Sequence, residues 1–314
     1  MSNLPLPAPT KNSWKNRLTR NRALILRLTG TLLAIGLLVL LFSKEWEEIR
    51  TAFVRIVSWR LLAALGLILI SRFCTIGRWY TLLRSAGVKM TPWQTITLTF
   101  TGLFSSNFLP TTIGGDVVRL AGAMQMGYDR PTCLASIAAD RLIGMAGMTT
   151  VLPFGIGPVW AMLQSGNLQA ISLIGLWQRG WGFIKRTLQA LTLWVKKPSA
   201  LFTALLFTWG HMTCTFLTVL VLIDGLGEHL SFWMIAGLWS VSYFITLIPI
   251  SVNGYGLQEL SISILFAQAG GLNMATSLTL AVLTRVLTMT ASLPGAFFLP
   301  SIMANLDRSQ NNPL

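Results

Sequence analysis

The sequence predicts an all-α integral membrane protein, a polytopic bundle of membrane-crossing helices. Hydrophobic residues make up 53% of the 314 positions, and charged residues only 11%. Several apolar stretches approach the roughly 20 residues that a helix needs to cross the bilayer core. Two interruptions rich in proline and glycine divide these stretches, near residues 107–119 and 248–259. We therefore expect about seven to eight spans that include two broken segments, which either cross the membrane or re-enter it.

Three regions follow one another along the chain. Residues 1–22 are basic, polar and proline-rich, which predicts a disordered cytoplasmic tail. Residues 23–303 form the membrane domain, and 304–314 form a short C-terminal tail. A cleavable signal peptide is the alternative for residues 11–43. The apolar run there is long and lacks a small-residue cleavage site, which favours an uncleaved first span.

Apolar stretches of suitable length recur through the membrane domain, and the third and seventh are short and adjoin the two breaks. The predicted segments are 23–43, 60–80, 94–109, 131–152, 199–223, 231–249, 257–270 and 276–300. Prolines and glycines leave the pattern between Pro153 and Gly180 ambiguous. Segment 181–195 alternates apolar and basic residues, which is typical of an amphipathic helix at the membrane interface.

The net charge of +14 is concentrated at the flanks of the predicted spans. Lysine and arginine crowd the N-terminal tail, residues 72–89 and residues 179–197, whereas Pro198 to Thr284 contains neither. Cytoplasmic loops of membrane proteins are enriched in these residues. We therefore expect both termini and the basic segments to be cytoplasmic in a plasma-membrane protein, with the acidic connector 224–229 outside. This placement argues against binding to nucleic acid.

The first break carries both charge signs in an otherwise apolar region. Lipid cannot satisfy the backbone groups that such a break frees, so protein or water must cover it. Its expected functional residues are Asn107, Pro110, Gly114, Gly115, Asp116 and Arg119. We expect the two glycines to be needed because glycine reaches positive φ and lets a headgroup or a neighbouring helix approach. The alternative for the two charged residues is a simple pair at a helix start.

The second break repeats this order, with a proline, then glycines, then an acid. Its residues are Pro249, Asn253, Gly254, Gly256 and Glu259. Interrupted hydrophobic segments in corresponding positions of two halves indicate a transport site between repeats. The arginine that follows is close in the first half, Arg119, and distant in the second, Arg285. The pattern is compatible with an inverted repeat.

Arg285 lies inside the last predicted span, and an intramembrane arginine is by default a functional hypothesis. Glu259 is its expected partner, although an acid near a helix start can also be a simple interfacial residue. We expect Asp116, Arg119, Glu259 and Arg285 to converge on one polar cavity. The arginines would face lipid phosphate, and the carboxylates would orient them.

Three motifs occur in a fixed order along the chain: Asn-Phe-Leu-Pro-x-x-x-Gly-Gly-Asp-x-x-Arg from residue 107, Ala-Asp-Arg-Leu from residue 139, and Asn-Gly-Tyr-Gly-Leu-Gln-Glu from residue 253. Together they resemble the transmembrane domain of lysylphosphatidylglycerol synthases, a family that also contains stand-alone flippase-like proteins. The resemblance covers about residues 20–305 and implies a domain that moves a lipid between leaflets. The synthases carry a soluble aminoacyl-transferase domain after the membrane part, and the resemblance does not include that domain, so synthase activity is not expected.

The resemblance adds Arg141, at a position where the family commonly has an acid and an arginine. It carries over these residues of the two breaks: Pro110, Gly114, Gly115, Asp116, Arg119, Gly254, Gly256 and Glu259. Asp140 and Arg141 are adjacent and should point to different faces of their helix. One would then flank a headgroup while the other pairs elsewhere.

Other kinds of site are not indicated. The three cysteines are isolated, and His211 and His229 lack further ligands at metal-binding spacing, so we expect no metal or cofactor. No nucleotide-binding motif and no catalytic residue are apparent. Tryptophans near the predicted span ends indicate an aromatic belt at the membrane interfaces. They are Trp46, Trp59, Trp79, Trp93, Trp160, Trp177, Trp181, Trp194 and Trp233.

These features predict a flippase-like translocase rather than an enzyme, with membrane lipids as its partners. Anionic phospholipid, aminoacylated phospholipid and polyprenyl-phosphate lipid all present phosphate to a basic group. The alternative is a membrane-embedded transferase or an accessory subunit in envelope lipid or glycan synthesis. A homo-oligomer or a partner from envelope synthesis is compatible with both.

Overall fold

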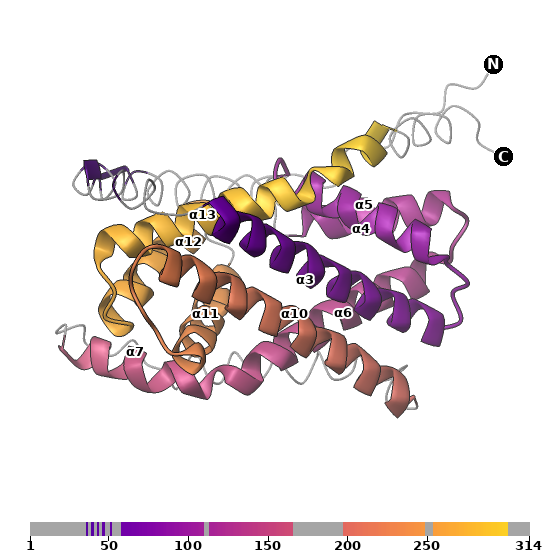
Figure 1. Cartoon of the computed structure of the whole chain (residues 1–314). Helices are drawn as coiled ribbons and strands as arrows, with labels where there is room; N and C mark the ends of the chain where they lie inside the picture. The colour runs from indigo at the N-terminus through magenta and orange to yellow at the C-terminus, as the bar shows by residue number, and fades with distance from the viewer. Residues whose placement is uncertain are drawn as a thin grey trace, which may run out of the picture.

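The computed structural model describes residues 58–109, 113–165, 197–248 and 254–300, with a few single positions before residue 58. Within these ranges all regular elements are helices (Figure 1), as the sequence predicts. They are α3 (Ser58–Ser85), α4 (Pro92–Ser106), α5 (Gly114–Gln125), α6 (Arg130–Val151), α7 (Pro153–Ser165), α10 (Pro198–Gly225), α11 (Phe232–Thr246), α12 (Leu257–Ile264), the π-helix η1 (Leu265–Ala269) and α13 (Met274–Ser292). Residues 294–300 are also helical. The predicted first span, the segment 181–195 and both tails lie outside these ranges.

Three helices in the described part of the chain are long and apolar enough to cross a membrane: α3, α10 and α13. Helices α6 and α7 form a fourth candidate span that is bent by 65°. Helix α3 continues to Ser85, so Arg72 and Arg78 lie inside it and not in a cytoplasmic segment as predicted. The sequence placed these arginines in a cytoplasmic flank, because hydropathy alone cannot show that an arginine inside a helix is buried with a partner.

Helices α4 and α5 pack as an antiparallel hairpin. At its base, the Tyr128 hydroxyl donates to Gln94 Oε1 at 2.9 Å. The arms cross at Gly102 and Gly115, where a Cβ on Gly115 would lie 2.4 Å from the Gly102 carbonyl oxygen. The arms are about 22 and 18 Å long at 1.5 Å per residue, short of the roughly 30 Å hydrocarbon core. The segment predicted as span 94–109 is thus one arm of a hairpin too short to cross the membrane, and the predicted break contains the start of the other arm.

Helix α11 forms a second antiparallel hairpin with α12 and its continuation η1. The hydroxyls of Ser242 and Ser261 hydrogen-bond across it at 2.6 Å, and Gly270 at its base lies against Leu238. Its arms are also short of the bilayer core, at about 22 and 20 Å. The predicted spans 231–249 and 257–270 are the two arms of this hairpin.

The two hairpins belong to two structural repeats. Helices α10 and α11 begin 140 residues after α3 and α4, and α13 begins 144 residues after α6. The paired helices α3 and α10 both contain 28 residues, and α4 and α11 both contain 15. The connecting turns match as well. Glycines with positive φ occur at Gly87 and Gly227 before the hairpins and at Gly127 and Gly271 after them, and the polar N-caps are Thr91, Ser231, Asp129 and Asn273.

The repeats are inverted relative to each other. Helices α3 and α10 lie side by side and run in opposite directions (Figure 1). Contacts along the pair join Arg60 with Asp224, Ser71 with His211, and Ser85 with Lys197. Ser71 Oγ lies 2.5 Å from His211 Nδ1, and these two residues are themselves 140 positions apart. The pseudo-two-fold axis therefore passes close to this contact, and the inverted repeat that the breaks suggested is present.

Each repeat places its last helix on the hairpin of the other repeat. Helix α7 packs on α11, where Gly155 crosses Gly237 (Figure 1). Residues 294–300 pack on α4, where a Cβ on Gly295 would lie 2.0 Å from the Phe100 carbonyl oxygen. A Leu-Pro pair precedes both helices, at residues 152–153 and 293–294. Small residues at these crossings let the backbones approach, as is common between membrane helices.

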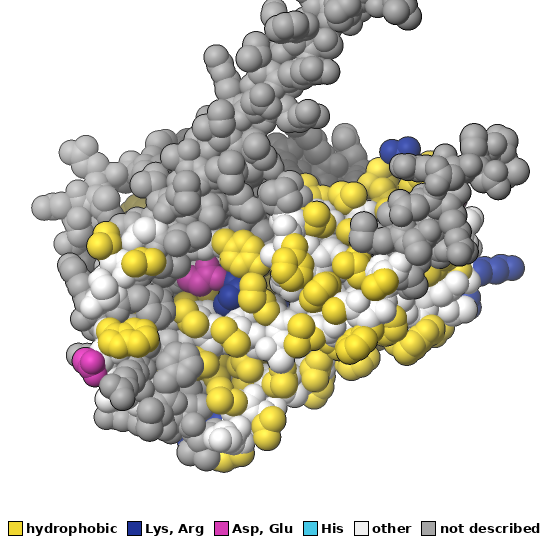
Figure 2. Space-filling model, turned by 90° about the horizontal axis from the view of Figure 1, so that it is seen from above, with side chains coloured by type: hydrophobic (Ala, Val, Ile, Leu, Met, Phe, Trp, Pro, Cys, Tyr) yellow, Lys and Arg dark blue, Asp and Glu magenta, His cyan; other side chains and the backbone are white. Residues whose placement is uncertain are grey.

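The two ends of the bundle differ in charge. Arg84, Lys89, Arg130 and Lys197 lie at the end that contains the α3–α4 turn and the starts of α6 and α10. Asp224 and Glu228 lie at the opposite end, where the Asn273 amide donates to the Glu228 carboxylate at 3.1 Å. Figure 2 shows Lys and Arg side chains projecting at one end and an acidic side chain at the other.

We expect the basic end to face the cytoplasm, because cytoplasmic loops are enriched in Lys and Arg. The test uses single cysteines at Lys89 and His229, in a variant whose three native cysteines are replaced, with an impermeant thiol reagent on intact cells. The cysteine at position 229 should react, and the one at position 89 should react only after permeabilisation. The reverse pattern would show that the protein is inserted the other way.

Candidate functional site

The candidate site begins at the first turn of α5, where Asp116 and Arg119 lie one helical turn apart. Arg119 Nη1 donates to Asp116 Oδ1 at 3.1 Å, and both residues are buried. The i, i+3 spacing and the position of the acid at a helix start favour this pair. The simple pairing that the sequence suggested is therefore present, but it is one part of a larger network.

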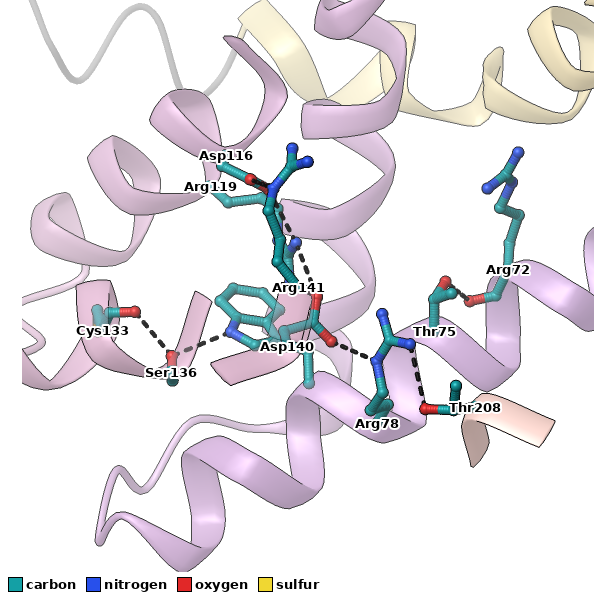
Figure 3. Close-up of polar contacts among 11 residues, drawn as sticks. Arg72, Thr75, Arg78, Asp116, Arg119, Cys133, Ser136, Asp140, Arg141 and Thr208 are labelled. Carbon is teal, nitrogen blue, oxygen red and sulfur yellow. Dashed lines mark hydrogen bonds and ion pairs between the residues drawn. The ribbon is translucent and has the colours of Figure 1, made fainter. Parts of the chain in front are cut away.

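Asp140 on α6 connects Arg119 to a further arginine, Arg78 (Figure 3). Arg78 Nε donates to Asp140 Oδ1 at 2.7 Å, and Arg119 Nη1 lies 3.3 Å from Asp140 Oδ2. Arg78 Nη1 also donates to the Thr208 hydroxyl on α10 at 3.2 Å. Asp140 and Arg78 are buried, so the network connects α3, α5, α6 and α10 in the interior of the bundle.

Arg141 completes the network by donating from Nε to Asp116 Oδ2. Its side chain retains 36% of its exposure, against 10% for Arg119. The two adjacent residues have different partners: Asp140 pairs with Arg78 and Arg119 inside the bundle, whereas Arg141 pairs with Asp116 on the second arm of the hairpin. Arg141 is the member of the network closest to the outside.

The ring of Trp79 packs against the guanidinium group of Arg119. The guanidinium carbon of Arg119 lies 3.9 Å from the centre of the Trp79 ring, a cation–π contact. The indole of Trp79 is fully buried and donates from Nε1 to the Ser136 hydroxyl at 3.1 Å. The assignment of Trp79 to an interfacial belt was therefore wrong, because the residue lies inside α3 and not near its end. Trp46, Trp59, Trp93, Trp160 and Trp233 are exposed, as a belt requires.

The network carries an excess positive charge. It contains three arginines and two aspartates, which gives a net charge of +1. Arg119 Nε is buried and has no hydrogen-bond partner among the described residues. A buried cation without full compensation is costly, so it favours an anion as an additional partner.

A pocket of about 140 Å³ lies beside this network. It is lined by Thr99, Gly102, Leu103, Ser106, Gly115, Asp116, Arg119 and Arg141. The Thr99 hydroxyl is buried and, within the described ranges, has no hydrogen-bond partner. The pocket thus lies on the first hairpin and has Arg119 and Arg141 in its wall, and two of its lining residues, Thr99 and Arg119, carry buried donors without a described partner.

Glu259 and Arg285 form an ion pair in the second repeat, as the sequence predicts. The guanidinium carbon of Arg285 lies 4.8 Å from the centre of the Tyr255 ring. The Tyr255 hydroxyl in turn donates to the carbonyl oxygen of Asn107 at 2.7 Å, and Asn107 Nδ2 donates to the Ser292 hydroxyl at 2.8 Å. The second break is thereby connected to the tip of the first hairpin, and the amide of Asn107, predicted to face a headgroup, contacts α13.

The two acid–arginine pairs occupy equivalent positions. Asp116 and Glu259 are both the third residue of the second hairpin arm. Arg141 and Arg285 are both the twelfth residue of the helix that follows. The counterpart of Arg285 is therefore Arg141, and not Arg119 as the sequence suggested. The wall of the pocket contains Asp116 and Arg119 but neither Glu259 nor Arg285, so the four charges that were predicted to converge on one cavity do not all line it.

The glycines of the two breaks act by different means. Gly254 and Gly256 have φ of 74° and 76°, which favours glycine. Gly114 and Gly115 lie inside the helix α5 and are not among the glycines with positive φ, so that part of the expectation was wrong. They are needed for close approach instead. A Cβ on Gly114 would lie 2.5 Å from Leu109 Cβ, and one on Gly115 would meet the backbone of Gly102.

Three predicted residues, Pro110, Pro249 and Asn253, lie outside the described residues. The sequence did not indicate Arg78, Trp79 or Tyr255 as site residues, and it left open which of Asp140 and Arg141 would flank a headgroup. Arg78 could have been found, because it falls on the helical stripe of α3 that carries Ala64, Ile68, Ser71 and Leu82, all of them buried. A charge on the buried stripe of a membrane helix indicates a partner. In the described part of the chain, no group of three or more His, Cys, Asp or Glu residues could hold a metal ion.

A comparison of the chain with curated proteins finds no match. A family model described as the lysylphosphatidylglycerol synthase TM region matches residues 27–295, which include both hairpins, both acid–arginine pairs and the pocket. The chain therefore belongs to the family of the lysylphosphatidylglycerol synthase transmembrane region.

Proposed function

We propose that this protein is a flippase-like translocase that moves a phosphate-bearing lipid between the two leaflets. The observation that carries the proposal is the pocket on the first hairpin, whose wall includes buried Arg119 of a network with net charge +1. The membership of a lipid-associated membrane family supports it. The lipid is a phospholipid or a polyprenyl-phosphate-linked lipid, because both present phosphate to the pocket.

The architecture supports transport in two ways. Inverted repeats can exchange conformations, so that one set of helices opens to each side in turn. Broken segments at membrane depth also supply a polar path for a headgroup while the acyl tails stay in lipid. The guanidinium groups of Arg119 and Arg141 can donate two parallel hydrogen bonds to phosphate, and this fork geometry is specific to arginine.

The test reconstitutes the full chain in liposomes that contain phosphatidylglycerol with a fluorescent label on one acyl tail. Dithionite added outside destroys the label in the outer leaflet only, so about half of the signal survives in vesicles without protein. With the protein, we expect the protected fraction to fall, and the recovered lipid to be chemically unchanged. A chemically modified product would indicate a membrane transferase instead, and an unchanged protected fraction for both phosphatidylglycerol and a polyprenyl-phosphate lipid would contradict the proposal.

Arg119→Lys is the matched variant for this assay, because it keeps the charge and loses the fork. We expect its rate of lipid movement to fall about tenfold or more, since a hydrogen bond to a charged group contributes about 1.5–3 kcal/mol. Arg130→Gln removes one exposed charge at the start of α6 and should leave the rate unchanged.

A further inference from the structure

We infer, building on the proposed lipid transport, that the two repeats have different roles at their equivalent sites. The pocket of the first repeat binds the phosphodiester of an anionic lipid headgroup, whereas the Glu259–Arg285 position of the second repeat, which carries no excess charge, does not.

The comparison of equivalent positions carries this inference. Both repeats keep the acid and the arginine, as Asp116 with Arg141 and Glu259 with Arg285. The three other charged residues of the first network have uncharged counterparts at the same repeat shifts. Arg78, Arg119 and Asp140 correspond to Thr218, Ile262 and Thr284.

The counterparts in the second repeat are satisfied without any ligand. Ile262 is 1% exposed and belongs to the hydrophobic core. The hydroxyls of Thr218 and Thr284 donate to carbonyl oxygens of their own helices, at 2.8 and 2.7 Å. Arg285 Nη2 and Glu259 Oε2 are, like Arg119 Nε, buried without a hydrogen-bond partner among the described residues, so the two repeats differ in their charge balance. The second position has equal numbers of opposite charges, while the first has one arginine in excess.

The donors of the first repeat are the ones that a phosphate requires. Arg119 is 8% exposed and lines the pocket, and its Nε has no hydrogen-bond partner among the described residues. The same holds for the Thr99 hydroxyl on the opposite arm of the hairpin. Phosphate oxygens accept several charge-assisted hydrogen bonds at once. A phosphodiester, which carries one negative charge, would also neutralise the net charge of +1.

The charge balance selects the class of headgroup. An anionic lipid such as phosphatidylglycerol brings its phosphodiester and no cation. A zwitterionic lipid also brings an ammonium group, which would lie beside Arg119 and Arg141 and be repelled by them. We therefore expect the site to prefer an anionic phospholipid over a zwitterionic one.

The experiment measures binding by calorimetry to the full chain in a neutral maltoside detergent. The probes are dihexanoyl phosphatidylglycerol, dihexanoyl phosphatidylcholine and sn-glycerol 3-phosphate. We expect phosphatidylglycerol to bind about tenfold or more tightly than phosphatidylcholine, because a charge-assisted hydrogen bond contributes this much. Equal affinities would overturn the preference for an anionic headgroup. Tight binding of sn-glycerol 3-phosphate without binding of phosphatidylglycerol would show that the site takes a soluble phosphate ester and not a lipid.

The chain supplies its own variant for the site, Arg119→Ile, which installs the residue that the second repeat carries at that position. Its affinity for dihexanoyl phosphatidylglycerol should fall about tenfold or more. The control Arg130→Gln, which removes an exposed charge, should stay within about twofold of the wild type. An unchanged affinity in Arg119→Ile would overturn the assignment of the pocket.

A second variant, Thr99→Val, keeps the test sound if Arg119→Ile fails to fold. It removes a buried hydroxyl without a described partner, so its melting temperature should not fall, while its affinity for phosphatidylglycerol should fall about threefold or more. Full affinity in this variant would contradict the role of Thr99. Lipid movement in liposomes without selective anion binding would overturn this inference and leave the proposed function standing. Selective binding without lipid movement would do the opposite.

Discussion

Replacing Asp140 by asparagine should destabilise the folded protein by about 3–5 kcal/mol, because it leaves two buried arginines without their shared counter-ion. The carboxylate accepts hydrogen bonds from Arg78 at 2.7 Å and from Arg119 at 3.3 Å. Asparagine has nearly the same size, but it raises the net charge of the network from +1 to +2. The melting temperature of the purified protein in detergent measures the effect.

The control for this variant removes one charge of each sign. Arg78→Thr combined with Asp140→Thr introduces the residues that the second repeat carries at these positions and keeps the net charge at +1. This double variant should recover a large part of the lost stability, since the pair couples through direct contact. If Asp140→Asn melts at the wild-type temperature, the network does not stabilise the interior as the geometry indicates.

Gly115→Val should abolish lipid movement. The Cβ of any other residue at this position would lie 2.4 Å from the Gly102 carbonyl oxygen, a backbone atom that cannot move alone. The arms of the first hairpin would have to separate, and Asp116 and Arg119, which follow directly on α5, would shift away from Asp140 and Arg141. The liposome assay with labelled phosphatidylglycerol measures the loss.

Gly66→Val is the matched control, because a Cβ on Gly66 in α3 would meet no atom within 4 Å. Valine has a higher helix propensity than glycine, and both positions lie in helices. Propensity therefore does not explain a difference between the two variants. Gly115→Val should remain in the membrane fraction at close to the wild-type amount. Full lipid movement in Gly115→Val would show that the close crossing of α4 and α5 is not required.

The sequence alone was sufficient for the features that depend on local composition. Hydropathy identifies the long apolar segments. Such segments must be helical in a bilayer, because their backbone polar groups have to form hydrogen bonds within the segment. Proline and glycine marked both breaks for the same reason, and the rarity of charges made Arg285 and Glu259 each other's expected partner, which the structure confirms. The order of proline, glycines and acid in both halves also indicated a repeat.

The tertiary structure decided which residues meet. Arg78 lies on the buried stripe of α3, which indicates a partner, but only the packing of α3 against α6 and α10 decides that the partners are Asp140 and Thr208. The equivalence of Arg141 and Arg285 was hidden because the second break is three residues longer than the first, which shifts the repeat from 140 to 143 positions within the hairpin. Contacts between residues 25 to 130 positions apart depend on how whole helices cross. Hydropathy and backbone preference are local properties and carry no information on those crossings, so the sequence determined the membrane helices and their breaks, and the packing determined the charged network and its pocket.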